Sequence, residues 1–342
     1  MTFHVTVQPS GRQFDCEADE TILNAAIRAG IGLPYGCKNG ACSTCKGMIM
    51  SGSVTHGSHQ EKALPAADEA KGYALFCCAR PTSDVLIEAR EVLGIGEFQI
   101  KKLPSRVSKL ERLADDVIAI SLQLPASEKL DYRAGQYIEF ILKDGKRRSY
   151  SIANASHIGE HLTLHIRHMP GGVFTDHVFA TMKERDILRF EGPLGTFFLR
   201  EDSRKPIVLL ASGTGFAPIK AIVEQAQYHK SERPMTLYWG GRRPRDLYMH
   251  DLCEEWARTI PHFNYVPVIS AADDTAQWQG RSGLVHQAVM TDLPDLSGYQ
   301  VYACGNPAMV DAAKADFANQ CGLPLDEFYA DAFTSEADLA AN

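Results

Sequence analysis

The feature of this sequence that most restricts its fold is a short loop rich in cysteine. Cys37, Cys42 and Cys45 have the spacing C-x4-C-x2-C, and a further cysteine follows at Cys77. Plant-type [2Fe-2S] clusters are bound with this spacing. Three thiolates from one loop can surround so compact a cluster only where the backbone turns tightly, which the glycines of the loop permit. The sequence therefore predicts a [2Fe-2S] site.

A tetrahedral zinc site is the alternative interpretation of the same cysteines. Structural zinc sites often pair two C-x2-C knuckles, and the sequence lacks a second one. The loop also stands between a predicted helix over residues 21–30 and a predicted strand over residues 45–52. Zinc is therefore the less favoured metal.

The first ninety or so residues resemble plant-type ferredoxins, both in the cysteine loop and in the segment around Cys77. The resemblance implies a β-grasp domain. Its cluster ligands would be Cys37, Cys42, Cys45 and Cys77. Cys78 is the competitor for the fourth position. Adjacent residues of an extended segment point to opposite sides, so we expect Cys78 to be a packing residue.

Length, charge and cysteine usage narrow the class of protein. A chain of 342 residues with 45% hydrophobic and 23% charged residues is expected to form two or three globular domains. A net charge of -7 without a basic block argues against nucleic acid as a partner. The sequence has no run of 18 apolar residues, no export signal and an odd number of cysteines, nine, so we expect a cytoplasmic protein without membrane insertion.

Alternating strands begin at Ser105, after a break in the pattern over residues 93–103. Apolar runs over residues 117–124, 137–142 and 162–167 are separated by Gly, Pro and Asp turns. Helix signals are sparse between them. This pattern is typical of a small antiparallel barrel.

One strand of this region carries the sequence Arg-Ser-Tyr-Ser over residues 148–151. The cation of Arg148 suits a diphosphate, the ring of Tyr150 suits an isoalloxazine, and the hydroxyl of Ser151 suits the polar edge of that ring. An alternating surface strand is the alternative interpretation. The motif therefore needs support from elsewhere in the chain.

A strand-to-helix turn downstream supplies that support. Its residues are Arg167, Gly171, Gly172, Val173 and Thr175. A helix is predicted over residues 174–182, and the amides at its start can hold phosphate oxygens. The order of the two motifs and of Gly192-Pro-Leu-Gly195 resembles the flavin-binding barrel of the ferredoxin-NADP reductase superfamily. This implies FAD, with Tyr150 stacked on the flavin, Ser151 near N5 and Arg148 at the diphosphate.

A different type of strand follows the barrel. Residues 207–212 are a continuous apolar run, as in a parallel strand covered on both faces. Gly213, Thr214 and Gly215 come next and let a diphosphate approach the backbone at the start of a helix. The G-x-G-x-x-P sequence departs from the dinucleotide fingerprint, because the third glycine is replaced and no acidic residue ends the next strand. A parallel-sheet, Rossmann-like domain is predicted.

A second turn of this kind carries Cys304, Gly305 and Pro307. Together the two turns resemble the nicotinamide domain of the same superfamily. The resemblance places Cys304 beside the nicotinamide C4. A buried thiol at the end of a strand is the alternative.

The choice between NADH and NADPH depends on the loop after residue 240. A carboxylate such as Asp246 suits a free ribose, whereas the three neighbouring arginines would suit a 2'-phosphate. Asp246 stands where NADP-specific relatives of the superfamily carry a hydroxyl. We therefore expect NADH, with NADPH as the alternative.

The segment over residues 327–333 resembles the end segment that covers the flavin in these reductases. It implies that Phe333 lies near the ring, and core packing is the alternative. The residues that follow, 334–342, are acidic and expected to fray.

The expected fold class is α+β and α/β multidomain. Its parts are a β-grasp ferredoxin domain, an antiparallel β-barrel FAD domain and a parallel-sheet nicotinamide domain. The expected boundaries are 1–92 for the ferredoxin domain, 93–103 for a linker, 104–200 for the FAD-binding domain, 205–335 for the NAD(P)-binding domain and 336–342 for a tail.

The order of these domains resembles the reductase components of bacterial aromatic oxygenases and, more closely, the CDP-6-deoxy-3,4-glucoseen reductases. The resemblance implies a monomeric oxidoreductase that passes electrons from NADH through FAD and [2Fe-2S] to an acceptor protein. That acceptor would be an oxygenase component or a dehydratase that uses pyridoxamine phosphate (PMP) and an iron-sulfur cluster. A flavin reductase that releases reduced flavin, and an iron-sulfur sensor or assembly module with a vestigial reductase half, are the alternatives.

Overall fold

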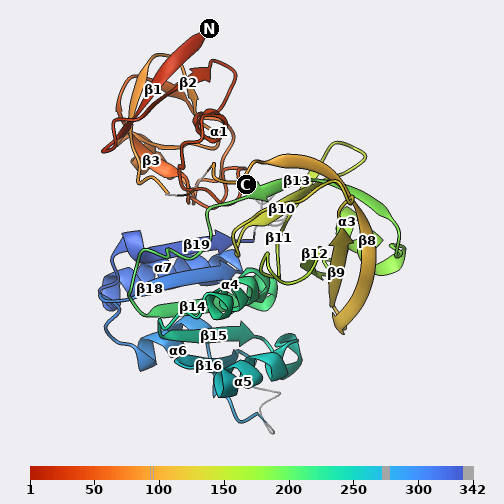
Figure 1. The fold of residues 1–342 in the computed structure, drawn as a ribbon. Coiled ribbons are helices and arrows are strands. Elements are labelled where there is room, and N and C mark those ends of the chain that lie inside the picture. The colour runs from red at the N-terminus through yellow and green to blue at the C-terminus, as the bar shows by residue number, and fades with distance from the viewer. Residues whose placement is uncertain (93, 95, 272–277, 334–342) are drawn as a thin grey trace. The chain divides into compact units, whose positions relative to one another are not determined.

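The computed structural model describes residues 1–92, 94, 96–271 and 278–333 (Figure 1). The described residues form two compact units, one of residues 1–99 together with residues 332 and 333, and one of residues 100–331. All nine cysteines are free thiols.

The first unit is built on one mixed sheet with the strand order β2-β1-β7-β3-β5. Strands β1 and β7 are parallel and the other neighbours antiparallel, as in a β-grasp fold. Its elements are β1 Thr2–Gln8, β2 Gln13–Glu17, α1 Ile22–Arg28, β3 Lys46–Ser51, β4 Val54–Thr55, α2 Ala66–Glu69, β5 Tyr73–Leu75, β6 Arg80–Pro81 and β7 Val85–Glu88.

Helix α1 forms where the sequence predicts a helix, and both of its ends have local causes. The hydroxyl of Thr21 accepts a hydrogen bond from the backbone N–H of Asn24 at 3.3 Å and so caps the start. Gly30 has a φ of 68°, a conformation that suits glycine just after a helix. The cysteine loop lies between this helix and β3.

The first part of the second unit is an antiparallel barrel with the strand order β11-β10-β13-β8-β9-β12. A bridge between Ile152 and Leu164 joins the two ends of this order and closes the barrel. Side chains such as Ile120, Ile138, Leu164 and Phe190 fill its interior. Its elements are β8 Lys101–Ala114, β9 Val117–Gln123, β10 Tyr137–Ile141, β11 Arg147–Ser151, β12 His161–Arg167, α3 Val173–Ala180 and β13 Ile187–Leu194.

The first barrel strand, β8, begins earlier than the sequence pattern predicted. The strand begins at Lys101, whereas the sequence pattern predicted alternating strands from Ser105. Lys101 pairs with Gly192 of β13, and Leu103 is buried against the barrel core. The pairing partner lies some ninety residues away in the sequence, so no local pattern marks these first strand residues.

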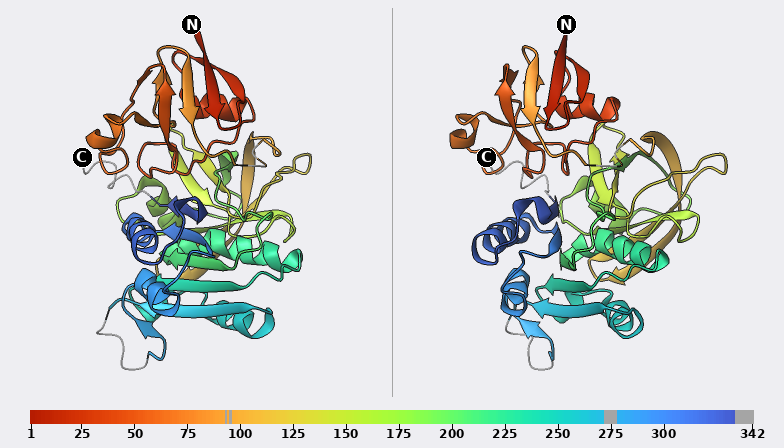
Figure 2. Two further views of the ribbon diagram at one scale, coloured as in Figure 1. Left: turned by 90° about the vertical axis from the view of Figure 1, so that its left-hand side faces the viewer. Right: turned by 60° about the vertical axis from the view of Figure 1, so that its left-hand side comes forward.

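The second part of this unit is a six-stranded sheet with the order β17-β16-β15-β14-β18-β19. The strands from β17 to β18 are parallel, as predicted for this region. Figure 2 shows α4 and α5 on one face of the sheet and α6 and α7 on the other. Its elements are β14 Ile207–Ser212, a 3-10 turn Gly213–Gly215, α4 Phe216–Tyr228, β15 Met235–Gly241, a 3-10 turn Pro244–Asp246, α5 His250–Thr259, β16 Phe263–Ile269, β17 Arg281–Ser282, α6 Val285–Asp292, β18 Gln300–Gly305, α7 Pro307–Gln320, a 3-10 turn Leu325–Glu327 and β19 Phe328–Ala332.

The strand order reverses its direction between β14 and β18. From β14 the chain proceeds to β15 and β16 on one side, and later returns to place β18 on the other side. Open parallel sheets bind ligands at the carboxyl ends of the strands at such a reversal. The turns after Ser212 and after Cys304 both lie there.

Among the helices in the described part of the chain, none has the length and apolar character needed to cross a bilayer.

Candidate functional site

The structure gathers the four cysteines predicted to bind the cluster. The thiol of Cys37 lies beside those of Cys42 and Cys77, and the thiol of Cys77 lies beside that of Cys45. The backbone N–H of Cys37 donates to Sγ of Cys42, and that of Ala41 donates to Sγ of Cys37, each at 3.4 Å. Four thiols with backbone amides aimed at the sulfurs are the donor set that a [2Fe-2S] cluster needs.

Cys78 does not behave as the sequence pattern predicted. Residues 76–78 form a turn rather than an extended segment, with the backbone N–H of Cys78 bonded to the carbonyl oxygen of Leu75 at 2.9 Å. The two neighbouring thiols therefore point to the same side, and their sulfurs are 3.5 Å apart. The expectation that Cys77 and Cys78 face opposite sides is wrong, because alternation holds only for extended backbone.

Gly40 brings Cys78 close to the cluster loop. Its φ is +77°, and a Cβ at this position would lie 2.9 Å from Sγ of Cys78 and 2.8 Å from Cβ of His59. A side chain at residue 40 would therefore be both strained and in collision with its neighbours.

The Arg-Ser-Tyr-Ser motif lies on β11 at one end of the barrel sheet. The ring of Tyr150 packs against Phe174, with 5.4 Å between the centroids, and against Phe140 at 6.0 Å. Burial raises the pKa of the Tyr150 hydroxyl. Arg148, two residues earlier, is on the same side of the strand and half-buried. The motif thus presents a ring and a cation together.

Asp331 is a site residue that the sequence pattern did not predict. It lies near Ser151 of the barrel and near Cys304 of the parallel sheet. The hydroxyl of Ser151 donates to Oδ2 of Asp331 at 3.3 Å, and Asp331 is buried on β19. Burial raises the pKa of Asp331 to about 6. Burial and the Asp331 carboxylate together raise the pKa of Cys304 well above its usual value. A lone carboxylate in the aromatic sequence 328–333 was the signal that could have revealed this residue.

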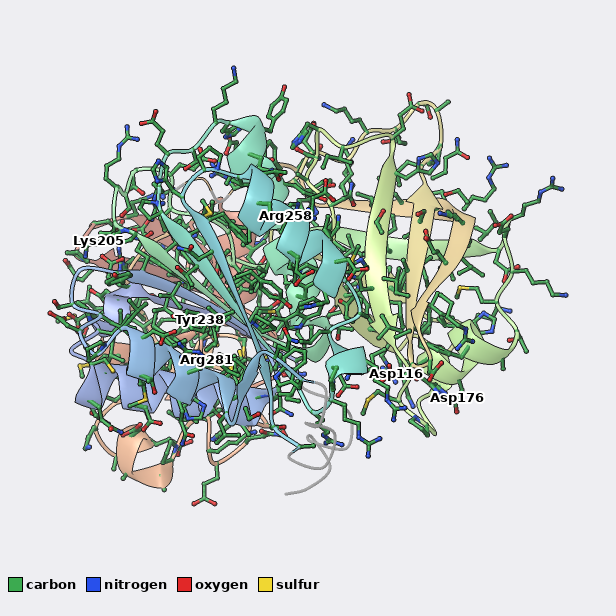
Figure 3. The ribbon with its side chains drawn as sticks, turned by 90° about the horizontal axis from the view of Figure 1, so that it is seen from below. Asp116, Asp176, Lys205, Tyr238, Arg258 and Arg281 are labelled. Carbon is green, nitrogen blue, oxygen red and sulfur yellow. The ribbon has the colours of Figure 1, made fainter. Side chains whose placement is uncertain are left out.

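The glycine turn before α3 is held by its own side chains. The hydroxyl of Thr175 donates to the carbonyl oxygen of Met169 at 2.9 Å and accepts its backbone N–H at 3.2 Å. The carboxylate of Asp176, labelled in Figure 3, accepts the backbone N–H of Gly171 at 3.1 Å. Thr175 therefore shapes the turn, and the start of α3, capped at Gly172, is left as the predicted phosphate site.

Two glycine turns meet where the sheet reverses. A Cβ on Gly215 would lie 2.1 Å from the carbonyl oxygen of Cys304, and a Cβ on Gly305 would lie 2.4 Å from that of Ser212. The hydroxyl of Ser212 accepts the backbone N–H of Asn306 at 2.8 Å. These positions have no room for a side chain, so bare backbone lines the turn, which continues through Thr214 into α4.

The guanidinium of Arg167 lies against the first of these turns. Its Nη1 is 3.5 Å from the position of a Cβ on Gly213, and its Nε is 3.4 Å from Oδ2 of Asp116, which Figure 3 labels. Its Nη2 is buried without a hydrogen-bond partner among the described residues. An unsatisfied buried guanidinium nitrogen beside a glycine turn fits an anionic oxygen such as that of a diphosphate.

Asp246 and Pro307 both lie at turns of the parallel sheet. The carboxylate of Asp246 accepts the backbone N–H groups of Arg242 and Arg243 at 2.9 and 3.0 Å. It therefore shapes the loop that was predicted to recognise the ribose. Pro307 is the first residue of α7, where its missing N–H costs nothing.

The remaining predictions concern the end of the chain. Phe333 directly follows β19 and is half-buried, and its role beside the flavin stays a prediction. The expectation of a frayed end over residues 334–342 lies outside the described residues.

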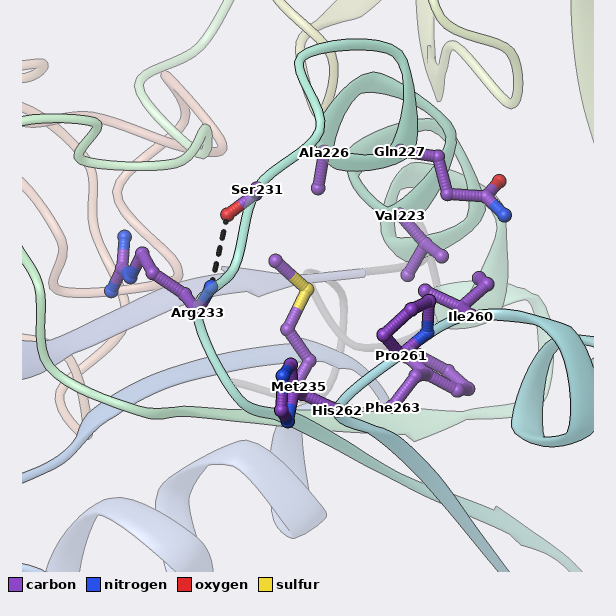
Figure 4. Close-up of a pocket in the computed structure, with 10 residues that line it drawn as sticks. All are labelled: Val223, Ala226, Gln227, Ser231, Arg233, Met235, Ile260, Pro261, His262 and Phe263. Atoms are coloured by element: carbon purple, nitrogen blue, oxygen red, sulfur yellow. Dashed lines mark hydrogen bonds between the residues drawn. The ribbon is translucent and has the colours of Figure 1, made fainter.

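The cavity drawn in Figure 4 lies away from these groups. The end of α4, the start of β15 and the turn before β16 line it, with Met235 and Phe263 among its residues. These residues stand at the amino ends of the strands, opposite the glycine turns. The cavity is therefore separate from the candidate site.

Comparison with known proteins gives three successive family matches along the chain. They are the 2Fe-2S iron-sulfur cluster binding domain over residues 5–82, the oxidoreductase FAD-binding domain over residues 104–199 and the oxidoreductase NAD-binding domain over residues 209–315.

Relatives match over almost the whole chain. The CDP-6-deoxy-L-threo-D-glycero-4-hexulose-3-dehydrase reductase of Yersinia pestis is 43% identical over 97% of this chain and 99% of its own length. A terephthalate 1,2-dioxygenase reductase component of a Comamonas species is 32% identical over 98% of both. Among solved structures, the Amycolatopsis cytochrome P450 reductase GcoB is 36% identical and superposes with a TM-score of 0.79 over 98% of this chain and 99% of its own.

The Cys77 and Cys78 pair allows a matched test of the fourth ligand. We expect Cys77→Ser to lose the visible absorbance of the [2Fe-2S] cluster and the acid-labile sulfide, because a cluster iron would lack a thiolate. Cys78→Ser should keep both. Retention of a full cluster by Cys77→Ser, together with its loss in Cys78→Ser, would assign the ligand to Cys78 instead.

Burial of Asp331 predicts a pH dependence of stability. Its pKa is raised from 3.8 to about 6, so ionisation is harder in the folded protein than in the unfolded chain. The wild type should therefore lose free energy of unfolding relative to Asp331→Asn as the pH rises from about 4 to about 6, and the full deficit of about 3 kcal/mol applies above that range.

Urea unfolding of the two proteins, followed by tryptophan fluorescence, measures this difference. We expect the deficit to grow by about 1 to 2 kcal/mol between about pH 5 and about pH 8. Equal pH dependence in both proteins would show that the Asp331 carboxyl titrates alike in the folded and unfolded states.

Proposed function

The chain belongs to the family of iron-sulfur flavoprotein reductases that join a ferredoxin-type domain to FAD-binding and NAD-binding domains, and we propose that its electron acceptor is a sugar dehydrase. The protein is an oxidoreductase that takes electrons from NADH and passes them through FAD and a [2Fe-2S] cluster to a partner protein. When bound, FAD supplies the conversion between a two-electron hydride donor and a one-electron cluster.

The identity of the acceptor rests on the sequence match with the Yersinia pestis reductase. That relative is named as the reductase of a dehydrase acting on a CDP-linked deoxyhexulose, and it is more similar to this chain than the terephthalate dioxygenase reductase is. The partner of this chain would accordingly be a dehydrase acting on a nucleotide-linked deoxysugar. An oxygenase component is the second candidate, because the oxygenase-related reductase matches as much of the chain.

The proposed domain limits follow the sequence expectation with one change. Residues 1–92 would form the ferredoxin domain, and the flavin barrel would start at Lys101, where β8 begins, rather than at residue 104. The nicotinamide domain would cover residues 205–335. We also propose that the protein is a monomer, which sedimentation at several concentrations would test.

The proposed roles of the barrel residues follow from their surroundings. Tyr150 would stack on the flavin, because its ring is fixed by Phe174 and Phe140. Arg148 and the start of α3 at Gly172 would hold the FAD diphosphate. Asp331 would orient the hydroxyl of Ser151 through their hydrogen bond. Each group binds or orients, and none needs to act as a nucleophile.

The proposed roles in the parallel sheet concern the nicotinamide nucleotide. Its diphosphate would lie along Gly213 to Gly215, where Arg167 offers the buried Nη2. The nicotinamide would lie beside Cys304, whose thiol stays neutral because burial raises its pKa. Gly305 would leave room for the ring, since the turn tolerates no side chain there.

Asp246 offers a test of cofactor choice that leaves the loop intact. Asp246→Asn keeps an oxygen for the amides of Arg242 and Arg243 but removes the charge that opposes a 2'-phosphate. We expect the ratio of kcat/KM for NADH to that for NADPH to fall by about tenfold in this variant. Asp246→Ala also removes the amide acceptor and should lower kcat/KM for both cofactors. An unchanged ratio in Asp246→Asn would remove Asp246 from the specificity determinants.

Reconstitution with candidate acceptors tests the proposed function directly. The purified protein and NADH are combined either with a CDP-6-deoxyhexulose dehydrase and its substrate, or with an aromatic oxygenase component and its substrate. We expect NADH oxidation to be coupled to sugar reduction, at a rate about tenfold or more above that with the oxygenase. Coupling to the oxygenase alone would replace the dehydrase proposal.

The Cys42→Ser variant is the control for the route of the electrons. It should lose coupling and the reduction of cytochrome c, while a dye that accepts electrons from the flavin still reacts, because only the cluster is removed. Persistent coupling in this variant would favour a reductase that releases free reduced flavin.

A further inference from the structure

Helix α4 contacts the flavin barrel through one row of side chains. Lys220, Glu224 and Tyr228 are spaced four residues apart, so they lie on the same face of the helix. The row meets residues 153–157, the segment that directly follows β11. The helix belongs to the parallel sheet, and the segment belongs to the barrel (Figure 1).

The first two members of the row bond to the backbone of this segment. Nζ of Lys220 donates to the carbonyl oxygen of Ala153 at 3.1 Å, and Oε2 of Glu224 accepts the backbone N–H of Ala155 at 3.0 Å. The two contacts are four residues apart on the helix and two residues apart on the segment, so they fix the segment at two successive points.

The third member of the row contacts the turn that follows Ala155. The ring of Tyr228 stacks on that of His157, with 4.0 Å between the centroids and 17° between the planes. Tyr228 is 61% exposed, so this end of the row lies at the surface, whereas Ala153 and Ala155 are buried.

The charges of the row are largely removed from water. Lys220 and Glu224 pair with each other, and their side chains are only 13% and 12% exposed. A buried ion pair carries a desolvation cost that its own attraction does not reliably offset. Here the two charges also satisfy a carbonyl and an amide of the barrel, which gives the pair a positional role.

The segment that receives these contacts is itself rigid. The side-chain amide of Asn154 donates to the carbonyl oxygens of Ala155, Ile158 and His161 at 3.1 to 3.3 Å. Its Oδ1 accepts the backbone N–H of Thr163 on β12 at 2.8 Å. These bonds fix the segment to the barrel strands. Lys220 and Glu224, which bond to the segment, are therefore fixed relative to the barrel as well.

The row connects the glycine turn at Gly215 with the end of β11 at Ser151, and each of these lies only a few residues from a contact of the row. Lys220 is five residues beyond Gly215, at the start of α4, and Ala153 is two residues beyond Ser151, at the end of β11. We propose that Lys220, Glu224 and Tyr228 are positioning residues that together hold the nicotinamide half of the site at the correct distance from the flavin half. The proposal rests on the proposed placement of FAD beside β11 and of NADH at the glycine turn.

The double variant Lys220→Met/Glu224→Met tests the proposal without leaving an unpaired buried charge. We expect the rate of flavin reduction by NADH, measured anaerobically by stopped flow, to fall by about tenfold or more, because small displacements of reacting groups are costly. The Kd for NADH and the FAD content should stay within about twofold of the wild type.

Amide hydrogen exchange gives a readout that does not depend on turnover. In the double variant, the segment over residues 153–157 should exchange faster, because the N–H of Ala155 loses its acceptor. The matched control is Gln225→Met. Gln225 also lies on α4, but its side-chain amide bonds to His229 at 2.9 Å rather than to residues 153–157. Neither the rate nor the exchange should change in the control.

An unchanged rate of flavin reduction in the double variant would overturn the proposal. A slower rate accompanied by an equally large loss of NADH affinity would also overturn it, since the row would then serve binding rather than positioning. Failure of the wild type to reduce its flavin with NADH would count against the proposed function instead, so the two failures are distinguishable.

Tyr228→Ala decides the question if the double variant fails to retain FAD. This residue is exposed, so its removal leaves the core intact. We expect flavin reduction to slow by about threefold at an unchanged Kd for NADH. A wild-type rate in Tyr228→Ala would then reject the positioning role.

Discussion

The close approach of two main chains at the carboxyl ends of β14 and β18 is the constraint on which the rest of the site depends. Gly215 and Gly305 each face a carbonyl oxygen of the other turn at a distance that excludes a Cβ. Backbone rather than side chains therefore lines the point where the sheet reverses. Cys304 is the last residue but one of β18 there, and Arg167 reaches the neighbouring turn at Gly213 from the barrel. The two folds of the second unit thus share one surface.

The chain surrounds this surface with groups that bind and orient rather than react. Hydride and electron transfer are chemistry of the cofactors, and the protein supplies their placement and the polarity around them. Cys304 and Tyr150 are kept neutral by burial, which raises the pKa of each. Asp331 is different, because burial raises the pKa of its carboxyl to about 6 and so weakens its preference for the charged form. Its hydrogen bond to Ser151 links that charge to the edge of the flavin site.

Local patterns predicted the elements whose cause is local. The apolar run of β14 matches the predicted residues 207–212, and α1 lies within the helix predicted over residues 21–30. The spacing of Cys37, Cys42 and Cys45 likewise predicted a shared site for these thiols, whereas the choice of Cys77 came from the resemblance to ferredoxins. For the helix, the strand and the loop, neighbouring residues carry the signal.

Features that depend on distant partners escaped the same reasoning. The first residues of β8 are strand because β13 pairs with them, and Asp331 matters because Ser151 lies opposite. The thiols of Cys77 and Cys78 lie side by side because residues 76–78 form a turn, which the sequence pattern did not predict. In the sequence, the row of Lys220, Glu224 and Tyr228 has the pattern of an ordinary helix surface. Its role is visible only in the structure, where the segment after β11 contacts it.

The hydrogen bond between Ser151 and Asp331 can form only late in biosynthesis, because its two partners are translated far apart in time. The two residues are 180 positions apart, and Asp331 lies on the edge strand of the parallel sheet. A nascent chain can close the flavin barrel on the ribosome while the whole nucleotide sheet is still to be translated. Until β19 emerges, the hydroxyl of Ser151 lacks the carboxylate that accepts its hydrogen bond. A chain interrupted before that strand could therefore acquire flavin yet lack the group that organises its reactive edge.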